Sequence, residues 1–577
     1  MSKGQAREAI MVADCGRGQT RATLLEVVDG VCRFVAQGVS PSSVEPPYDD
    51  LQVGLRAAVG ALEEAAVRRF TTEAQLLTPQ DDSGDGIDAV LATMAACPPL
   101  RITLLSAGAS ALVAALVDIC RQSPVTVLPG LTLDAATRAD DTLHEQVALL
   151  GQQQPDVLIL VAGDTQAGAL PHLLDVAEDI VAAFPLTATP PAILVIGEER
   201  FQATAVQAFG KGYEFGWLVV PANAAGNAEL AAAIGQELAD LANRRAGNTL
   251  AGFGSLEART AAPPIARARA LELVNRFMAL QFACEVVTLD LEDGLTCCWA
   301  RGAEHRALSE PALDLALGAA NLLTGLTLTN VLQWLPFAYS EDELHGWILN
   351  RALRPFTVPT TRKDRQIEVA LVRELARVAA TELGGEQGLT PDLVVGGAFF
   401  ARWPNPATAF LALVDGVRPR PASGLTQLAL DREGLLPAIG ALGVLEPGRA
   451  AEVFEHDGLL DLGAHLAIEC PPNETVRGQL TRADGHTEEF SVPGGALLRL
   501  PLRAGERAAS VRIEAGGRAA VGRGNPGAGA VLEGPAAPHG GPVGLVIDTR
   551  GHALALPRND QERIARLTAW SAALGDD

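Results

Sequence analysis

The chain has 577 residues, of which 48% are hydrophobic, and a formal net charge of −24 at pH 7. This length and apolar content suffice for three or four domains, each with its own core. The acidic balance argues against a nucleic-acid partner, because neutralising phosphates requires a basic surface. The first residues lack the apolar core of a signal peptide and no apolar run is long enough to cross a membrane, so we expect a cytoplasmic protein without membrane contact.

Residues 1–99 predict three strands followed by a helix. Apolar runs at 10–13, 22–28 and 31–37 are separated by glycine turns, and the step Asp29-Gly30 is typical of a hairpin. Leucine and valine side chains then recur at helical spacing within 49–67. We interpret residues 1–99 as the first lobe of a larger body.

Residues 100–247 alternate between short apolar strands and amphipathic helices. The expected helices are 170–184 and 229–244, and the expected strands are 102–105, 125–128, 157–161, 193–196 and 218–220. Such alternation predicts a parallel sheet covered on both faces, here a doubly wound α/β insertion. The turn at 162–168 follows one of these strands, and its Asp164 and Thr165 either face a ligand or cap the next helix.

The remaining sequence predicts two further parts. A stretch rich in Gly, Ala, Thr and Pro at 247–270 indicates a linker or lobe crossover, and residues 248–445 form a second lobe with a strong helix at 366–383. Residues 446–577 carry short alternating runs broken by Gly, Pro and Asp, which favours an all-β domain that ends in a helix at 560–574.

The first candidate site is the turn after the first strand. Asp14 ends an apolar run and is followed by Gly16, Gly18 and Thr20. The N–H groups of such a turn can face phosphate oxygens, while the aspartate holds Mg²⁺ or acts in catalysis. Arg17 and Arg21 favour this interpretation because a guanidinium pairs with phosphate oxygens. A plain turn between two strands explains the same glycines.

A second turn repeats the pattern. Asp290 follows the apolar run 286–289 and precedes Gly294 and Thr296, which makes it a second candidate for catalysis or for Mg²⁺. Glu292 and Asp293, however, stand where a phosphate-binding turn has glycines. Their carboxylates repel a polyphosphate and their side chains fill its space. We expect a protein that kept this fold but lost ATP hydrolysis. The alternative is a metal ion that bridges the carboxylates and the phosphates.

A third turn, Gly396-Gly397, follows the expected strand 393–395 and can bring the backbone close to a nucleoside, or simply join a strand to a helix. Together the three turns resemble those of a two-lobed actin/hexokinase-like body built from ribonuclease H-like lobes. ATP and Mg²⁺ would then be the cofactors, with their binding in doubt.

Cysteine and histidine give no sign of metal catalysis. The eight cysteines form no C-x-x-C pair, and the nine histidines show no metal-binding spacing. The nearest match to the cobalt-ligating D-x-H-x-x-G turn is Asp484-Gly485-His486, which ends in Glu489. The sequence therefore carries no cobalamin ligand motif.

In chain order, these segments resemble the glutamate mutase L (MutL) family. The resemblance is carried by DCGRGQTR at 14–21, PDVLILVAGDTQAG at 155–168, LVIGEE at 194–199, DLEDGLTC at 290–297, LDLALGAANLL, RPFTVP, VVGGAFFA and GLVIDTRGHALALP. The departures from the family pattern are Arg17-Gly18 for Ser-Thr, Arg21 for Lys, Glu292-Asp293 for Gly-Gly and Cys297 for Asp.

This resemblance implies an actin-like ATPase fold and an accessory role in an adenosylcobalamin-dependent mutase system, in reactivation or maturation. The partner would be the mutase or another protein. Two other functions stay open. One is an active ATPase or kinase in which Asp14 or Asp290 is the general base. The other is a non-catalytic scaffold or interaction protein.

Overall fold

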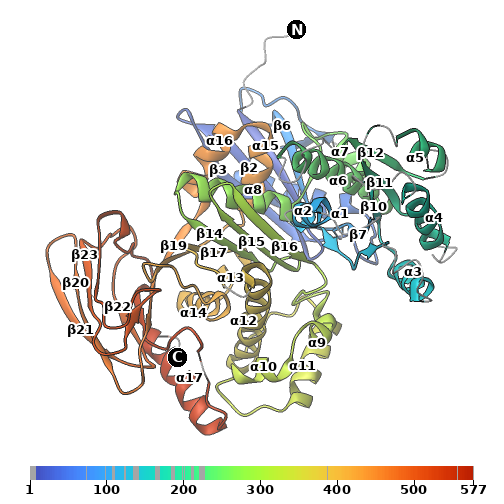
Figure 1. Cartoon of the computed structure of the whole chain (residues 1–577). Coiled ribbons are helices and arrows are strands. Elements are labelled where there is room, and N and C mark those ends of the chain that lie inside the picture. The colour runs from blue at the N-terminus through green and yellow to red at the C-terminus, as the bar shows by residue number, and fades with distance from the viewer. Residues whose placement is uncertain are drawn as a thin grey trace. The chain divides into compact units, whose positions relative to one another are not determined.

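Figure 1 shows the computed structural model of the chain. It describes residues 8–575 apart from 73–74, 98, 107–110, 122–124, 134–141, 163–168, 183–188, 198, 200–201, 210–212, 220–227, 386–387 and 555. Two compact units emerge: the first comprises Met1–Ala96, Ser255–Arg306 and Glu310–Asp577, and the second comprises Cys97–Gly254 and Ala307–Ser309. Among the described helices, none combines the length and the apolar character needed to span a membrane.

The first sheet of the larger unit opens the chain. Its order is β13-β6-β1-β2-β3, with bounds Ile265–Ala266, Ala89–Met94, Ala9–Cys15, Gln19–Val28 and Val31–Pro41. Strands β1 to β3 form an antiparallel meander, and β6 returns parallel to β1. Helix α1 (Leu51–Ala66) begins at the N-cap Asp50 and buries its leucine and valine face, as its periodicity predicts. A small pair, β4 (Thr71–Thr72) and β5 (Gln75–Leu76), follows it.

The second sheet repeats this topology. Its order is β16-β15-β14-β17-β18-β19-β26-β22, and the bounds are Glu304–Glu310, Leu295–Arg301, Glu285–Asp290, Leu393–Gly396, Leu425–Leu430, Leu460–Glu469, Gly544–Asp548 and Leu497–Leu500. Strand β24 (Ala520–Val521) pairs with β19. Strands β14 and β15 are antiparallel, whereas β17 lies parallel to β14 and β18 parallel to β17. A meander followed by parallel strands thus occurs twice, which confirms the two-lobed actin-like body.

Helices cover the second sheet and link it to the rest of the larger unit. The bounds are α7 Phe253–Glu257, α8 Arg267–Gln281, α9 Leu322–Gly325, α10 Leu328–Gln333, α11 Glu341–Leu353, α12 Arg362–Gly384, α13 Ala398–Ala401, α14 Pro406–Val417, α15 Leu436–Leu445 and α16 Pro447–Val453. Helix α12 corresponds to the helix expected at 366–383. The segment expected as a linker at 247–270 instead contains α7, β13 and the start of α8.

The C-terminal region is rich in strands, as expected. Strands β19, β26 and β22 continue the second-lobe sheet. A separate antiparallel sheet has the order β21-β20-β23-β25, with bounds Thr487–Pro493, Thr475–Thr481, Ser510–Glu514 and Ala530–Glu533. Both sheets contribute to one core that includes Leu466, Val476 and Ile547. The terminal helix α17 spans Asp560–Leu574. A domain boundary at residue 446 stays a prediction.

The smaller unit is a parallel sheet in the order β12-β11-β10-β7-β8, with β9 beside β7. Its strands are Phe215–Val219, Ala192–Gly197, Val157–Ala162, Arg101–Ser106, Thr126–Val127 and Leu131–Thr132, and its helices are α2 Ala111–Arg121, α3 Thr142–Gln153, α4 Ala169–Ala182, α5 Gln202–Phe209 and α6 Ala228–Thr249. Alternate residues of β10 enter two separate cores, with Leu158 in one and Ile159 in the other. Both faces are covered, and the doubly wound insertion is confirmed.

Candidate functional site

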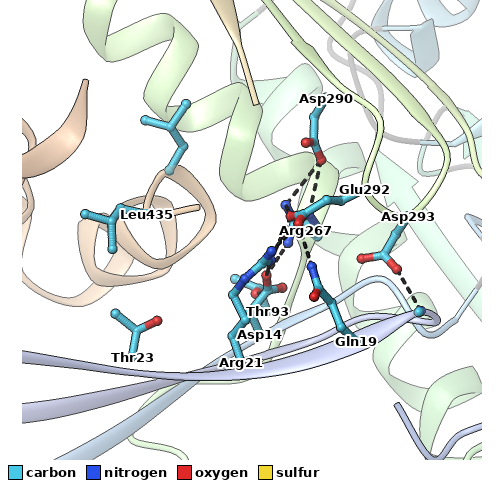
Figure 2. A network of polar contacts seen from close by, with 12 residues as sticks. Asp14, Gln19, Arg21, Thr23, Thr93, Arg267, Asp290, Glu292, Asp293 and Leu435 are labelled. Atoms are coloured by element: carbon cyan, nitrogen blue, oxygen red, sulfur yellow. Dashed lines mark hydrogen bonds and ion pairs between the residues drawn. The ribbon is translucent and has the colours of Figure 1, made fainter. Parts of the chain in front are cut away.

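The two motif aspartates lie at equivalent strand ends. Asp14 is near the end of β1 and Asp290 ends β14. Each of these strands has an antiparallel neighbour on one side and a parallel neighbour on the other. Asp14 and Asp290 are 4% and 2% exposed. Both carboxylates contact one guanidinium, that of Arg267: Asp14 Oδ2 pairs with Nη1, and Asp290 Oδ2 lies 3.2 Å from Nη2. The two aspartates therefore face each other across a single buried cation (Figure 2).

Arg267 is the first residue of α8, and it is 4% exposed. Its Nη2 also donates to Glu292 Oε2 at 2.7 Å. Burial opposes the charge on this guanidinium, but Asp14, Asp290 and Glu292 outweigh burial and raise the pKa of Arg267 well above its usual value. A permanent positive charge thus occupies the space between the strand-end aspartates.

Glu292 is held by the first lobe. Arg21 on β2 makes a two-pronged contact with it, in which Nη1 donates to Oε2 at 2.7 Å and Nη2 pairs with Oε1. Gln19 Nε2 donates to the same Oε1 at 2.5 Å. Burial favours the neutral acid, but Arg21 and Arg267 prevail and lower the pKa of Glu292 to about 2. The residue that departs from the glycine pattern is therefore an ionised partner of two arginines.

Asp293 binds the turn that was expected to bind phosphate. Its Oδ1 accepts from the backbone N–H groups of Arg17, at 2.8 Å, and of Gly18, at 3.2 Å. A Cβ at Gly16 would overlap the Asp293 carboxylate, so only glycine allows this approach. Burial, with Asp14 and Glu292, raises the pKa of Asp293 to about 7 although Arg267 opposes the shift. The loop amides do face an anion, but this anion belongs to the chain.

Asp14 and Asp290 also have neighbours in their own sheets. Thr93 on β6 donates its hydroxyl to Asp14 Oδ1 at 2.6 Å. Asp290 Oδ1 is buried and accepts no hydrogen bond from the described residues. Burial raises the pKa of Asp290, and Arg267 only partly offsets this. Gly397 makes room for Asp290, because a Cβ there would overlap its carboxylate.

The other predicted binding residues have mainly structural surroundings. Gly294 has φ +102 and its Cα packs against the backbone of Pro311, as the tight turn requires. Thr296 pairs with Asp290 across β14 and β15. Gly396 packs against Leu430 and Phe400. Within the described part of the chain, the hydroxyl of Thr20 is buried without a hydrogen-bond partner.

Three site residues were not predicted from the sequence, and one predicted turn lies outside the residues that the structure describes. Arg267 at the centre, Thr93 on β6 and Gln19 on β2 were not anticipated. Arg267 sits in a segment that resembles a linker, and nothing in its neighbourhood marks it as buried. The turn at 162–168, with Asp164 and Thr165, lies outside the described residues.

Mg²⁺ and ATP do not fit this arrangement of side chains. A metal bound by Asp14 and Asp290 would have to occupy the position of the Arg267 guanidinium, and a phosphate on the loop amides would have to displace Asp293. Across the described residues, no group of three His, Cys, Asp or Glu is placed to hold a metal ion. The carboxylates of Asp14, Asp290 and Glu292 are compensated by the guanidiniums of Arg21 and Arg267 instead, and Asp293 accepts from backbone N–H groups.

Comparison with known proteins gives one family match and several remote structural likenesses. Among solved structures, the chain is similar to a ROK family glucokinase from Streptomyces griseus in complex with glucose and AMPPNP (13% identity, 76% of this chain and 98% of that chain, TM-score 0.27). It is also similar to xylulose kinase from Bifidobacterium adolescentis (12%, 80% and 96%, TM-score 0.25) and to a Ppx/GppA family member from Aquifex aeolicus (10%, 79% and 92%, TM-score 0.19). Likenesses this remote say nothing of activity.

No curated protein matches the chain. A family model described as MutL protein matches residues 10–222, which include the Asp14 turn and the strands of the smaller unit. The resemblance to the glutamate mutase L family is thereby confirmed over residues 10–222.

Proposed function

We propose that this chain is a glutamate mutase L-like accessory protein that acts on an adenosylcobalamin-dependent mutase, in reactivation or maturation, without hydrolysing ATP. One observation carries the proposal: the nucleotide site expected from the two aspartate turns is filled by side chains of the chain itself. Arg267 takes the place of a cation between Asp14 and Asp290, and Asp293 takes the place of an anion on the amides of Arg17 and Gly18.

The free energy that holds this cluster together argues against nucleotide binding. Removing Arg267 from its three carboxylates leaves buried charges uncompensated, at a cost of about 3–5 kcal/mol. A nucleotide that bound an open site with a Kd of about 10 µM would then bind in the millimolar range or more weakly. Asp293 would have to leave its two amide donors as well. ATP in the cell would therefore find this site occupied by the side chains of Arg267 and Asp293.

The same cluster suits a protein that works by binding another protein. It ties β1 and β2 of the first lobe to α8 and to the turn between β14 and β15 in the second lobe. An ATPase of this superfamily uses lobe closure around its nucleotide, whereas here internal ion pairs hold the lobes together. A permanently closed body offers a partner a preorganised surface, which lowers the entropic cost of association.

Calorimetric titration of Mg·ATP tests the absence of nucleotide binding. We expect no saturable heat with the wild-type chain up to millimolar ATP. Binding tighter than about 100 µM that Asp14→Ala abolishes would establish the ATPase or kinase alternative instead. Arg33→Ala is a matched control, because it removes an arginine whose partner is Asp457, outside the cluster.

Sedimentation of the chain with an adenosylcobalamin-dependent mutase tests the partner. The proposal expects a complex that forms equally well with and without Mg·ATP. A complex that needs ATP contradicts the closed-site argument. No complex with the mutase, together with no nucleotide binding, leaves the scaffold alternative with another partner.

A further inference from the structure

A pocket of about 420 Å³, its open mouth included, lies in the larger unit away from the Arg267 cluster. Its wall combines the end of α14 with the following residues Arg418 and Arg420, strand β19, and the end of β26 with the turn after it. The pocket has an apolar side that includes Ile468 and Leu554, and a strongly polar side. None of the three expected phosphate-binding turns lies in it, but its wall includes Asp548, Arg550 and His552 of the segment GLVIDTRGHALALP.

Buried charges form the polar side. Arg550 Nε donates to Asp548 Oδ1 at 3.0 Å, and its Nη2 lies 2.8 Å from both Asp548 Oδ2 and Asp415 Oδ1. His465 Nε2 is 3.0 Å from Asp548 Oδ2. The side chains of Arg550 and His465 are only 2% and 4% exposed. The Trp570 ring, 4.8 Å from the Arg550 guanidinium carbon, fixes this guanidinium from another side.

Three side-chain atoms of this network make no hydrogen bond within the described chain; one of them, Asp415 Oδ1, still lies 2.8 Å from Arg550 Nη2 as an ion pair. Arg550 Nη1 and His465 Nδ1 are buried, and neither has a hydrogen-bond partner among the described residues. A buried polar atom without a partner is costly, and arginine nitrogen can only donate. His465 faces the carboxylate of Asp548 through Nε2, so in the tautomer that donates to this carboxylate Nδ1 is an acceptor. The pair thus offers one donor and one acceptor.

Around the pocket, the carboxylates are paired with cations or with backbone N–H groups. Asp415 and Asp548 are engaged by Arg550, with Arg373 Nε also 3.1 Å from Asp415 Oδ2. Glu469 accepts from the backbone N–H of His552. Arg418 donates from Nε to the carbonyl of Asp415 and from Nη1 to that of Ala553 at 3.4 Å, and Arg420 donates from Nε to the carbonyl of Gly522.

The field of these arginines reaches His552. Burial lowers the pKa of His552, and the guanidiniums of Arg420, Arg418 and Arg523 lower it further. Like charge also depresses the pKa of Arg418 in addition to burial. The pocket is lined by three arginines and three carboxylates, so its formal charges balance. The unpartnered Nη1 of Arg550 is the donor left for an anionic oxygen.

We propose that the pocket binds a small anion that carries a hydroxyl group, either hydrogen phosphate or a hydroxycarboxylate, with an anionic oxygen on Arg550 Nη1 and the hydroxyl donating to His465 Nδ1. Arg418 and Arg420 attract the anion at the mouth, and the side with Ile468 and Leu554 accommodates any carbon skeleton. This site is independent of the proposed accessory function.

Calorimetric titration of the full chain with inorganic phosphate, with malate and with acetate tests the proposal. We expect one saturable site for phosphate or malate, and binding at least about tenfold weaker for acetate, which has an anionic oxygen but no hydroxyl. Phosphate alone or malate alone as the ligand decides between the two sources of the same chemistry. No saturable binding of either up to about 50 mM overturns the proposal.

Substitutions test whether the anion binds in this pocket. Arg420→Gln, at the mouth, should weaken binding about tenfold, and His465→Gln should weaken it while reducing the preference over acetate. Arg518→Gln is the matched control, because its side chain is 75% exposed and outside the pocket. Equal affinity in Arg420→Gln and the control assigns the ion to an adventitious surface site and refutes the proposal. Circular dichroism checks folding, and Arg418→Gln replaces His465→Gln if that variant unfolds.

Discussion

Replacing Arg267 by Ala is the sharpest test of the ion-pair cluster. The guanidinium contacts Asp14, Asp290 and Glu292 and is 4% exposed, so its loss leaves these carboxylates in a buried site with only Arg21 to compensate them. Breaking a buried pair by removing one partner costs about 3–5 kcal/mol. That is a large share of the roughly 5–15 kcal/mol by which native proteins are stable.

The loss should depend on pH. Without Arg267 the pKa values of its carboxylate partners rise, so the folded variant binds protons that the unfolded chain has released above about pH 4. Its free energy of unfolding therefore falls as pH rises, and the difference from wild type grows between pH 5 and 8. The loss of stability relative to wild type is smallest at the lowest pH, where the carboxyls of the variant are neutral.

Urea unfolding followed by tryptophan fluorescence measures this effect, since every tryptophan except Trp217 lies in the larger unit with the cluster. Arg69→Ala is the control: it removes a 77% exposed arginine paired with Asp85 and should cost at most about 1 kcal/mol. If Arg267→Ala costs no more than this control and shows no dependence on pH, the cluster does not hold the lobes and our reasoning is refuted.

Three further substitutions test single parts of the site. Asp293→Asn should flatten the pH dependence. Wild type loses stability between about pH 4 and 7, because this carboxyl ionises in the unfolded chain while the buried one keeps its proton, and the variant should be more stable at pH 8 by at most about 4 kcal/mol in urea unfolding. An unchanged pH profile contradicts the raised pKa. Glu292→Gln should lower the free energy of unfolding by about 3 kcal/mol at pH 7. The difference from wild type should shrink as pH falls from 4.5 toward 2, because wild type loses the same ion pairs there. Ellipticity followed during acid titration of both proteins measures this change. Gly397→Ala should lower stability by about 1–3 kcal/mol in thermal unfolding, because the new Cβ overlaps the Asp290 carboxylate. In the control Gly448→Ala the new Cβ contacts no other atom, and the variant should be neutral or slightly stabilised. Equal melting temperatures of the two variants would show that Asp290 has room to move.

The fold could be predicted from sequence because its signals are local. Alternating and helical apolar spacing marked β1 to β3, α1 and α12, and wholly apolar runs marked β10 and β11. The repeat of an aspartate at the end of β1 and of β14 indicated two similar lobes. The matching topologies of the two sheets agree with this prediction. The segment at 247–270 was expected to be a linker or lobe crossover, and the change from the smaller to the larger unit does fall within it, between Gly254 and Ser255. Its Gly, Ala and Pro content did not indicate α7, β13 and the start of α8.

The site could be predicted only in part, because its geometry depends on distant residues. The sequence indicated that Glu292 and Asp293 conflict with a polyphosphate. It could not indicate that Asp293 reaches the amides of Arg17 and Gly18, some 275 residues earlier. Nor does a lone arginine at the start of a helix reveal a central buried cation. Such roles arise from lobe packing, which no local pattern records.

The continuation of the second-lobe sheet into the C-terminal region has a consequence for dissecting the chain. Strand β19 pairs antiparallel with β18 over most of its length, and β26 in turn pairs with β19. A truncated chain ending at residue 445 would leave the N–H and C=O groups of β18 exposed along one edge, which is a template for intermolecular strand pairing. Shortened versions should therefore keep residues up to the end of β26 if they are to stay monodisperse in solution.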